Sequence, residues 1–166
     1  MLNKKQLIEM QEYVEIRLSI LAFSSMEKCE ESNILESVQN IEIEDFIKNK
    51  RKPTFYQTLF SYIDKTGVTD SEIYKKAGID RRHFSKIRSN PDYRIGKNTA
   101  IALAIALELS EKETDKLLSS AGYSLSDSET FDLIIKFCLE KKIYNSDDVN
   151  QALVYFSLKP LFGVLI

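Results

Sequence analysis

The sequence is poor in the residues that build metal sites, disulfide frameworks and tight turns. Its 166 residues include one histidine, two cysteines, no tryptophan, five glycines and three prolines. A structural zinc site needs several cysteine or histidine ligands, so we expect no metal and no cofactor. Glycine and proline form most turns, and their scarcity argues against a β-rich fold. We expect Cys29 and Cys138 to be reduced thiols, with Cys138 in a core.

Motifs for catalysis and for export are also missing. There is no glycine-rich phosphate loop and no arrangement typical of a nucleophile with its base, so we expect no enzymatic activity. The longest strongly apolar run, residues 100–109, is too short to cross a bilayer. The first ten residues, MLNKKQLIEM, lack the apolar segment of a secretory signal. We therefore expect a cytoplasmic protein without a membrane partner.

Charge is unevenly distributed along the chain. The formal net charge is −2, from 23 basic and 25 acidic side chains. Residues 1–45 carry −6, residues 46–98 carry +8 and residues 99–166 carry −4. A basic middle between acidic flanks indicates a candidate nucleic-acid surface. The alternative is an ordinary solvated charged surface.

Helical spacing of apolar residues predicts an all-α fold. Residues 4–23 are predicted as one amphipathic helix, residues 24–40 as a polar, acidic connector with at most one short helix, and residues 41–50 as a short helix. Capping-box patterns predict further helix starts at the pairs Thr54 with Gln57, Thr69 with Glu72, Ser110 with Glu113, and Ser126 with Glu129. Asp80 is predicted to cap a helix over residues 81–89, and further helices are expected over 99–109 and 146–156.

We expect three parts in the chain. Residues 1–50 form an N-terminal helical arm, residues 51–122 a compact helical core, and residues 123–166 a C-terminal helical pair packed on that core. The N-terminal helix has a wider apolar face than a surface helix needs. We therefore expect a homodimer with this helix in the interface, and we expect the apolar tail of the chain to fold back on the core.

The stretch TGVTDSEIYKKAGIDRRHFSKIRSN, followed by NTAIALAIALELS, resembles the helix-turn-helix of the lambda-repressor/Cro-like (Xre) family. The resemblance covers residues 54–122, with Gly78 at the turn and Phe84 and Ile87 at inward positions. It also extends to an appended C-terminal module of bacterial proteins of largely uncharacterised function. It implies a lambda-repressor-like core and a sequence-specific transcriptional regulator, bacterial or phage in character, whose partner is double-stranded DNA.

The outward face of residues 81–89 follows from helix geometry. With Phe84 at 0° and about 100° per residue, Ile87 falls at about 300° and the core direction near 330°. Arg82, Lys86 and Ser89 then point away from the core, with Ser85 and Arg81 beside them. Arginine is the commonest reader of base edges, so the candidate DNA-binding residues are Arg81, Arg82, Ser85, Lys86 and Ser89, with Arg94 and Lys97 in the following loop as phosphate contacts.

Two positions depart from the family pattern. Asp70 stands where the family usually has a glutamine that touches the DNA backbone, and phosphate would repel its charge. Tyr74 stands where a small alanine is usual, so we expect it to push two helices apart or to point elsewhere. The alternative function is therefore a protein-interaction or adaptor module in a stress or phage-defence system, without DNA binding.

Overall fold

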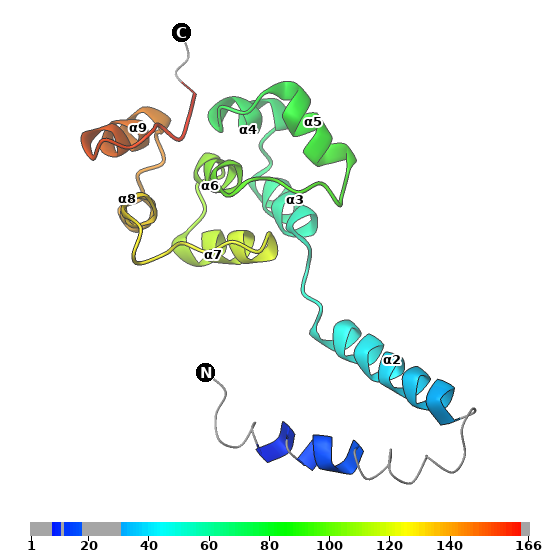
Figure 1. Cartoon of the computed structure of the whole chain (residues 1–166). Coiled ribbons are helices and arrows are strands. Elements are labelled where there is room, and N and C mark those ends of the chain that lie inside the picture. Colours follow the sequence, from blue (N-terminus) through cyan, green and yellow to red (C-terminus); the bar gives the residue numbers. More distant parts are fainter. Residues whose placement is uncertain (1–7, 11, 18–30, 164–166) are drawn as a thin grey trace. The chain divides into compact units, whose positions relative to one another are not determined.

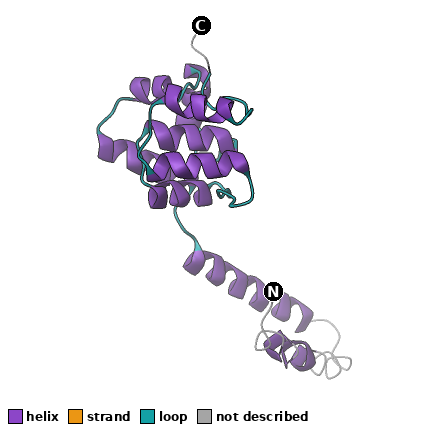
Figure 2. Ribbon diagram, turned by 90° about the vertical axis from the view of Figure 1, so that its left-hand side faces the viewer, coloured by secondary structure: helices purple, strands orange, loops and turns teal. Residues whose placement is uncertain are grey.

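The described residues, 8–10, 12–17 and 31–163 of a computed structural model, are helices and connecting loops without a strand (Figures 1 and 2). The all-α expectation is confirmed. Two compact units divide the chain, residues 1–51 and residues 52–166. The labelled helices are α2 (Glu31–Lys50), α3 (Phe55–Thr66), α4 (Asp70–Lys76), α5 (Arg81–Ser89), α6 (Lys97–Ala106), α7 (Glu111–Ser120), α8 (Thr130–Glu140) and α9 (Ser146–Tyr155). None of the described helices has the length and apolarity needed to span a membrane.

Helix α6 lies inside the second unit. Every residue from Ala100 to Leu107 is buried. A helix that is apolar all round needs neighbours on all sides. It packs against α4 and α7, and α7 in turn packs against α3 and α8. The helix begins at Lys97, two residues before the predicted start, with Gly96 as its N-cap.

Three of the four predicted capping boxes are present. They open α3 at Thr54, α4 at Thr69 and α7 at Ser110. Hydrogen bonds from the backbone and hydroxyl of Thr69 lower the pKa of Glu72, because they stabilise its ionised form. The fourth box was wrong. Helix α8 begins after Glu129 without a side-chain cap, and the backbone N–H of Ser126 donates instead to Asp132, at 2.7 Å.

The C-terminal helices complete the same core, as expected. The Tyr144 hydroxyl donates to the carbonyl of Leu109 at 3.0 Å, which ties the loop before α9 to the loop between α6 and α7. Cys138 is 1% exposed, and burial raises the pKa of its thiol. The tail folds back: the Asn150 side chain donates to the carbonyl of Phe162 and accepts from its N–H, both at 3.0 Å. Phe162 is buried.

The turn between α4 and α5 depends on Gly78. Its φ is +64°, in the left-handed region that glycine adopts without steric cost. The returning tail also lies close to it: a Cβ added at Gly78 would meet the backbone nitrogen of Gly163 at 3.4 Å. This turn therefore depends on glycine because of its backbone conformation, since a Cβ would make only ordinary van der Waals contact with the tail.

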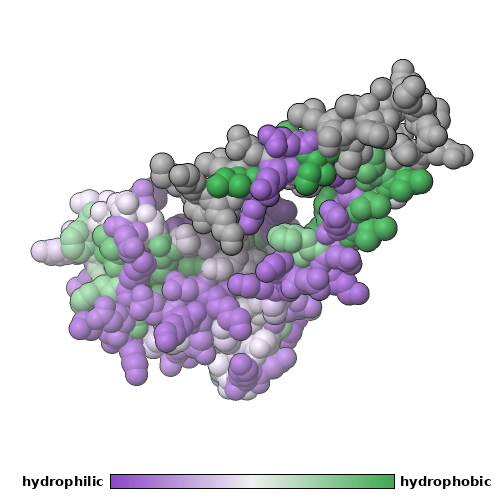
Figure 3. All heavy atoms as spheres, turned by 90° about the horizontal axis from the view of Figure 1, so that it is seen from below, coloured by the Kyte–Doolittle hydropathy of each residue, from purple (hydrophilic) through white to green (hydrophobic). Residues whose placement is uncertain are grey.

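The first unit differs from the prediction. Residues 31–50 form one continuous helix. The helix expected over 41–50 is present as its second part, whereas the connector expected over 24–40 was wrong where residues are described. Residues 8–10 and 12–17 are helical, and the rest of the helix predicted over 4–23 lies outside the described residues. Figure 3 shows apolar side chains, in green, at the surface of the protein. The exposed large apolar side chains of these two segments are Ile8, Met10, Tyr13, Val14, Ile16, Ile34, Leu35, Val38, Ile41, Ile43, Phe46 and Ile47.

We expect Gly78→Ala to lower the free energy of unfolding by about 1–2 kcal/mol, because a Cβ is strained at this φ. Gly163→Ala is the matched control, because a Cβ there meets nothing within 4 Å and φ is not in the left-handed region. Chemical denaturation of both variants measures the difference. Equal stability of the two variants would contradict the role given to Gly78.

Candidate nucleic-acid interface

Helix α5 is fixed by one cap and two anchors. The Asp80 carboxylate accepts a hydrogen bond from the N–H of Arg82 at 2.7 Å, which satisfies a backbone donor at the start of the helix. Phe84 and Ile87 are each 2% exposed and hold the helix on the core. The inward positions predicted from the sequence are thereby confirmed, and the remaining side chains of this short helix can face solvent.

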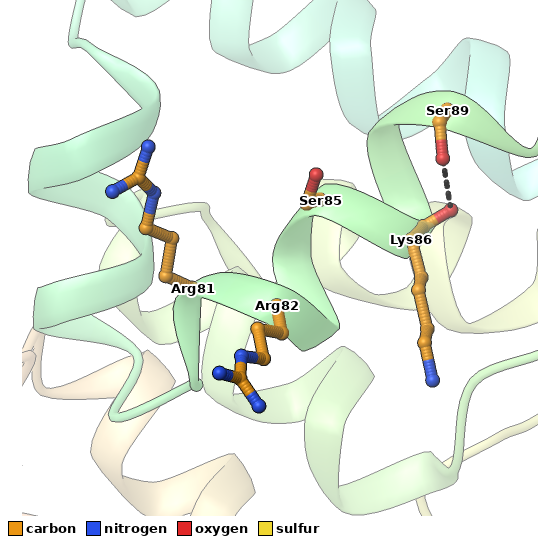
Figure 4. A pocket seen from close by; sticks show the side chains of 5 residues that line it. All are labelled: Arg81, Arg82, Ser85, Lys86 and Ser89. Atoms are coloured by element: carbon orange, nitrogen blue, oxygen red, sulfur yellow. Dashed lines mark hydrogen bonds between the residues drawn. The ribbon is translucent and has the colours of Figure 1, made fainter.

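Five predicted site residues come together on the outward side of α5. Arg81, Arg82, Ser85, Lys86 and Ser89 are exposed and line one shallow hollow of about 370 Å³. Figure 4 shows that Arg82 and Lys86 point to the same side, while Arg81 points away from them. The Ser89 hydroxyl donates to the carbonyl of Lys86 at 3.5 Å, a long and weak bond.

The cations of this surface are not neutralised by the protein. Among the described residues, none of the ion pairs includes Arg81, Arg82 or Lys86. Exposed cations that line one hollow and have no ion pair can contact phosphate oxygens or the acceptor atoms of guanine. The arrangement is suited to an anionic ligand.

The loop after α5 supplies another predicted residue, Arg94. It is exposed and lines a second hollow of about 900 Å³ with Tyr93, the start of α3 and the end of α7. The Tyr123 hydroxyl donates to the carbonyl of Ile95 at 2.9 Å and anchors the loop. His83 is half-buried, and its ring lies 5.8 Å from that of Tyr93 in an edge-on contact. A packing role for His83 therefore explains its position.

Lys97 does not lie in the loop where the sequence placed it. It is the first residue of α6, and its amine donates to Asp132 at 2.6 Å. The Asp132 side chain is 2% exposed, whereas that of Lys97 is 31% exposed. Because this carboxylate also accepts from Ser126, it joins the start of α6 to the start of α8. The charge of Lys97 is paired with Asp132 inside the unit, so Lys97 was wrongly predicted as a phosphate contact in the loop.

The sequence reasoning missed an ion pair beside this surface. Arg88, in the last turn of α5, donates through Nε and Nη2 to the two carboxylate oxygens of Asp70, at 2.9 and 2.8 Å. The charge of Asp70 is thus paired and not left facing solvent alone. At about 100° per residue, Arg88 lies about 40° from Phe84 around the helix, on the side of α4. This angle was the signal in the sequence that Arg88 does not share the outward face. Tyr74 is half-buried with its ring 5.9 Å from Phe84, so it packs between α4 and α5.

Comparison with protein-family models, with curated proteins and with solved structures finds no match for this chain. Within the part of the chain that the structure describes, no group of three or more histidine, cysteine, aspartate or glutamate side chains is arranged to hold a metal ion.

We expect Asp132→Ala to lower the free energy of unfolding by about 2–4 kcal/mol, because it leaves a half-buried N–H and a half-buried amine without their acceptor. Asp127→Ala is the control, because that carboxylate is 83% exposed in its ion pair with Lys136 and should contribute less than about 1 kcal/mol. Denaturant titration compares them. If the two losses were the same, Asp132 would be no more than a surface ion pair.

Proposed function

We propose that this protein is a sequence-specific DNA-binding transcriptional regulator of the Xre type. In this proposal α5 enters the major groove, Arg81, Arg82 and Lys86 reach base edges, Ser85 and Ser89 add hydrogen bonds, and Arg94 contacts phosphate. The observation that carries the proposal is the outward face of α5: three exposed cations without an intramolecular ion pair, on a helix whose opposite side is buried.

The dimensions of α5 support this assignment. It has nine residues, and a helix fits in the major groove of B-form DNA, about 12 Å wide. Arg82 and Lys86 are four residues apart and point the same way, so they can address neighbouring base pairs together. One such helix buries little surface, so a single copy should bind with modest affinity. Its contacts to phosphate should make binding weaken steeply as salt rises.

The first test is a selection from random-sequence duplexes with the purified protein, followed by the double variant Arg82→Ala/Lys86→Ala. We expect the variant to lose about 1–3 kcal/mol of discrimination for each base contact removed, and its fold to remain intact because both side chains are exposed. Binding to the selected and to scrambled duplexes is measured by fluorescence anisotropy.

The matched control is Lys112→Ala/Lys116→Ala, which removes the same charge from exposed positions on α7. The control should keep the preference for the selected duplex, although its overall affinity falls slightly with the lost charge. A parent protein that enriches no sequence, or an Arg82/Lys86 variant that discriminates as well as the parent, would refute the assignment of α5 as the reading helix.

The second candidate function is the protein-interaction or adaptor module. It is favoured by the exposed apolar side chains of residues 8–17 and α2, because large exposed apolar patches mark association sites. A pull-down at low salt separates the two candidates: recovery of one protein partner with no DNA retained would favour the adaptor.

We also propose that the protein is a homodimer, with apolar side chains of the N-terminal arm in the interface. A dimer gives a reading helix access to two half-sites, and it covers side chains such as Ile41 and Phe46, which are 55% and 64% exposed. We expect light scattering at tens of micromolar protein to give twice the 19.1 kDa of one chain. A mass of one chain would exclude the dimer.

The interface is located by Ile41→Glu/Phe46→Glu, which should shift the protein to the monomer because buried glutamates are costly. The control is Phe137→Glu, at an apolar side chain of α8 that is 55% exposed. If only the control disrupts the dimer, the interface lies on the C-terminal helices.

A further inference from the structure

The guanidinium of Arg88 lies between an aromatic ring and a carboxylate. Its Cζ is 4.1 Å from the centre of the Phe60 ring, and two of its nitrogens donate to the two oxygens of Asp70 at 2.9 and 2.8 Å. The carbonyl of Arg88 accepts a hydrogen bond from the Tyr56 hydroxyl at 3.1 Å, so the backbone of this residue is held as well. Arg88 is thus oriented by three separate contacts.

Such a preoriented guanidinium is a binding site for a flat or tetrahedral oxyanion. The two-pronged donor geometry of arginine fits carboxylate and phosphate alike, and stacking on a ring keeps the donors aligned. The Arg88 and Asp70 side chains are 43% and 36% exposed, so an anion from solvent can reach the pair. Arg88 is also on the same helix as Arg81, Arg82 and Lys86, whose charges remain unpaired.

We propose that Arg88 and Phe60 form a phosphate-binding site that Asp70 occupies from within the protein. Asp70 is then a specificity-determining residue: it keeps one cation of α5 out of contacts that any nucleic acid could make. The inference rests on the proposed DNA-binding function and adds a means of limiting non-specific binding to it.

Contacts to phosphate position a protein on DNA but carry no sequence information. Every duplex has the same phosphate backbone, so a free Arg88 would strengthen binding to all sequences nearly equally. Non-specific sites vastly outnumber a specific site, and the ratio of the two affinities decides occupancy. Because Arg88 is paired with Asp70, it adds less to the electrostatic binding that all sequences share. The base contacts of Arg81, Arg82 and Lys86 are unchanged, so the ratio of specific to non-specific affinity rises.

The test is Asp70→Asn, which keeps the size of the side chain and one oxygen acceptor but removes the charge that competes with phosphate. The probe is a random-sequence duplex of about 20 base pairs, titrated at several salt concentrations. We expect about threefold to tenfold tighter binding at low salt and a slope of log K against log salt that is steeper by about 0.9, the value for one added phosphate contact.

Two controls separate this effect from simpler ones. Asp64→Asn makes the same charge change at an exposed position on α3 and should give a much smaller gain. Asp70→Asn/Arg88→Gln should return the affinity and the salt slope to those of the parent, because the gain requires a free guanidinium. In the parent background, Arg88→Gln should leave the salt slope unchanged, whereas Arg82→Gln should reduce it.

The inference is overturned if Asp70→Asn binds the random duplex no more tightly than Asp64→Asn, or if the gain survives loss of Arg88. It is also overturned if Arg88→Gln alone lowers the salt slope as much as Arg82→Gln, a result that stays readable even if Asp70→Asn folds poorly. The proposed function is decided separately, by the preference of the parent for a selected sequence. If the parent prefers no sequence but Asp70→Asn still binds the random duplex more tightly, the anion site is supported and the proposed function is refuted.

Discussion

The burial of α6 is the constraint on which the second unit depends. Its residues from Ala100 onward are all buried, so other helices must cover it on every side. Each buried leucine or isoleucine in such a helix contributes about 1.5–3 kcal/mol, which offsets the cost of ordering the short helices around it. Helix α5 contributes two buried side chains to this core. It is anchored by Phe84 and Ile87, and for that reason most of its surface remains available to a ligand.

Helix α5 has few apolar anchors, so local contacts that bury little apolar area also hold it in place. Asp80 caps the start of α5, and near its end Arg88 bonds to Asp70 of α4 and stacks on Phe60 of α3. The left-handed backbone at Gly78 sets the turn between α4 and α5, and the C-terminal tail lies against the same glycine. These contacts orient α5 from both ends, although it has only two apolar anchors. Such orientation is needed by any binding helix whose side chains must reach fixed positions on a ligand.

The elements that the sequence predicted well carry local signals. The capping boxes at Thr54 and Thr69 specify helix starts through the side chains themselves. The full length of α2 was missed because its apolar residues change sides. At about 100° per residue, Ile34, Val38 and Ile41 share one side, and Ile43, Phe46 and Ile47 lie roughly opposite. A single helical stripe is therefore absent, although the helix is continuous. The pairing of Lys97 with Asp132 and of Arg88 with Asp70 depends on tertiary contacts, and no local pattern specifies those.

These pairs change how the charge of the sequence should be interpreted. Residues 46–98 carry +8, but Arg88, Lys97 and, at 3.8 Å, Lys76 each have an acidic partner within the second unit. Within the described part of the chain, Arg81, Arg82 and Lys86 are the cations of α5 that have no ion pair. Phosphate affinity follows the contacts that a protein can actually make, because each one releases counterions, and not the summed charge of a segment. A chain with a net charge of −2 can therefore present a compact cationic surface, and its interaction with DNA would depend on a few residues whose removal is decisive.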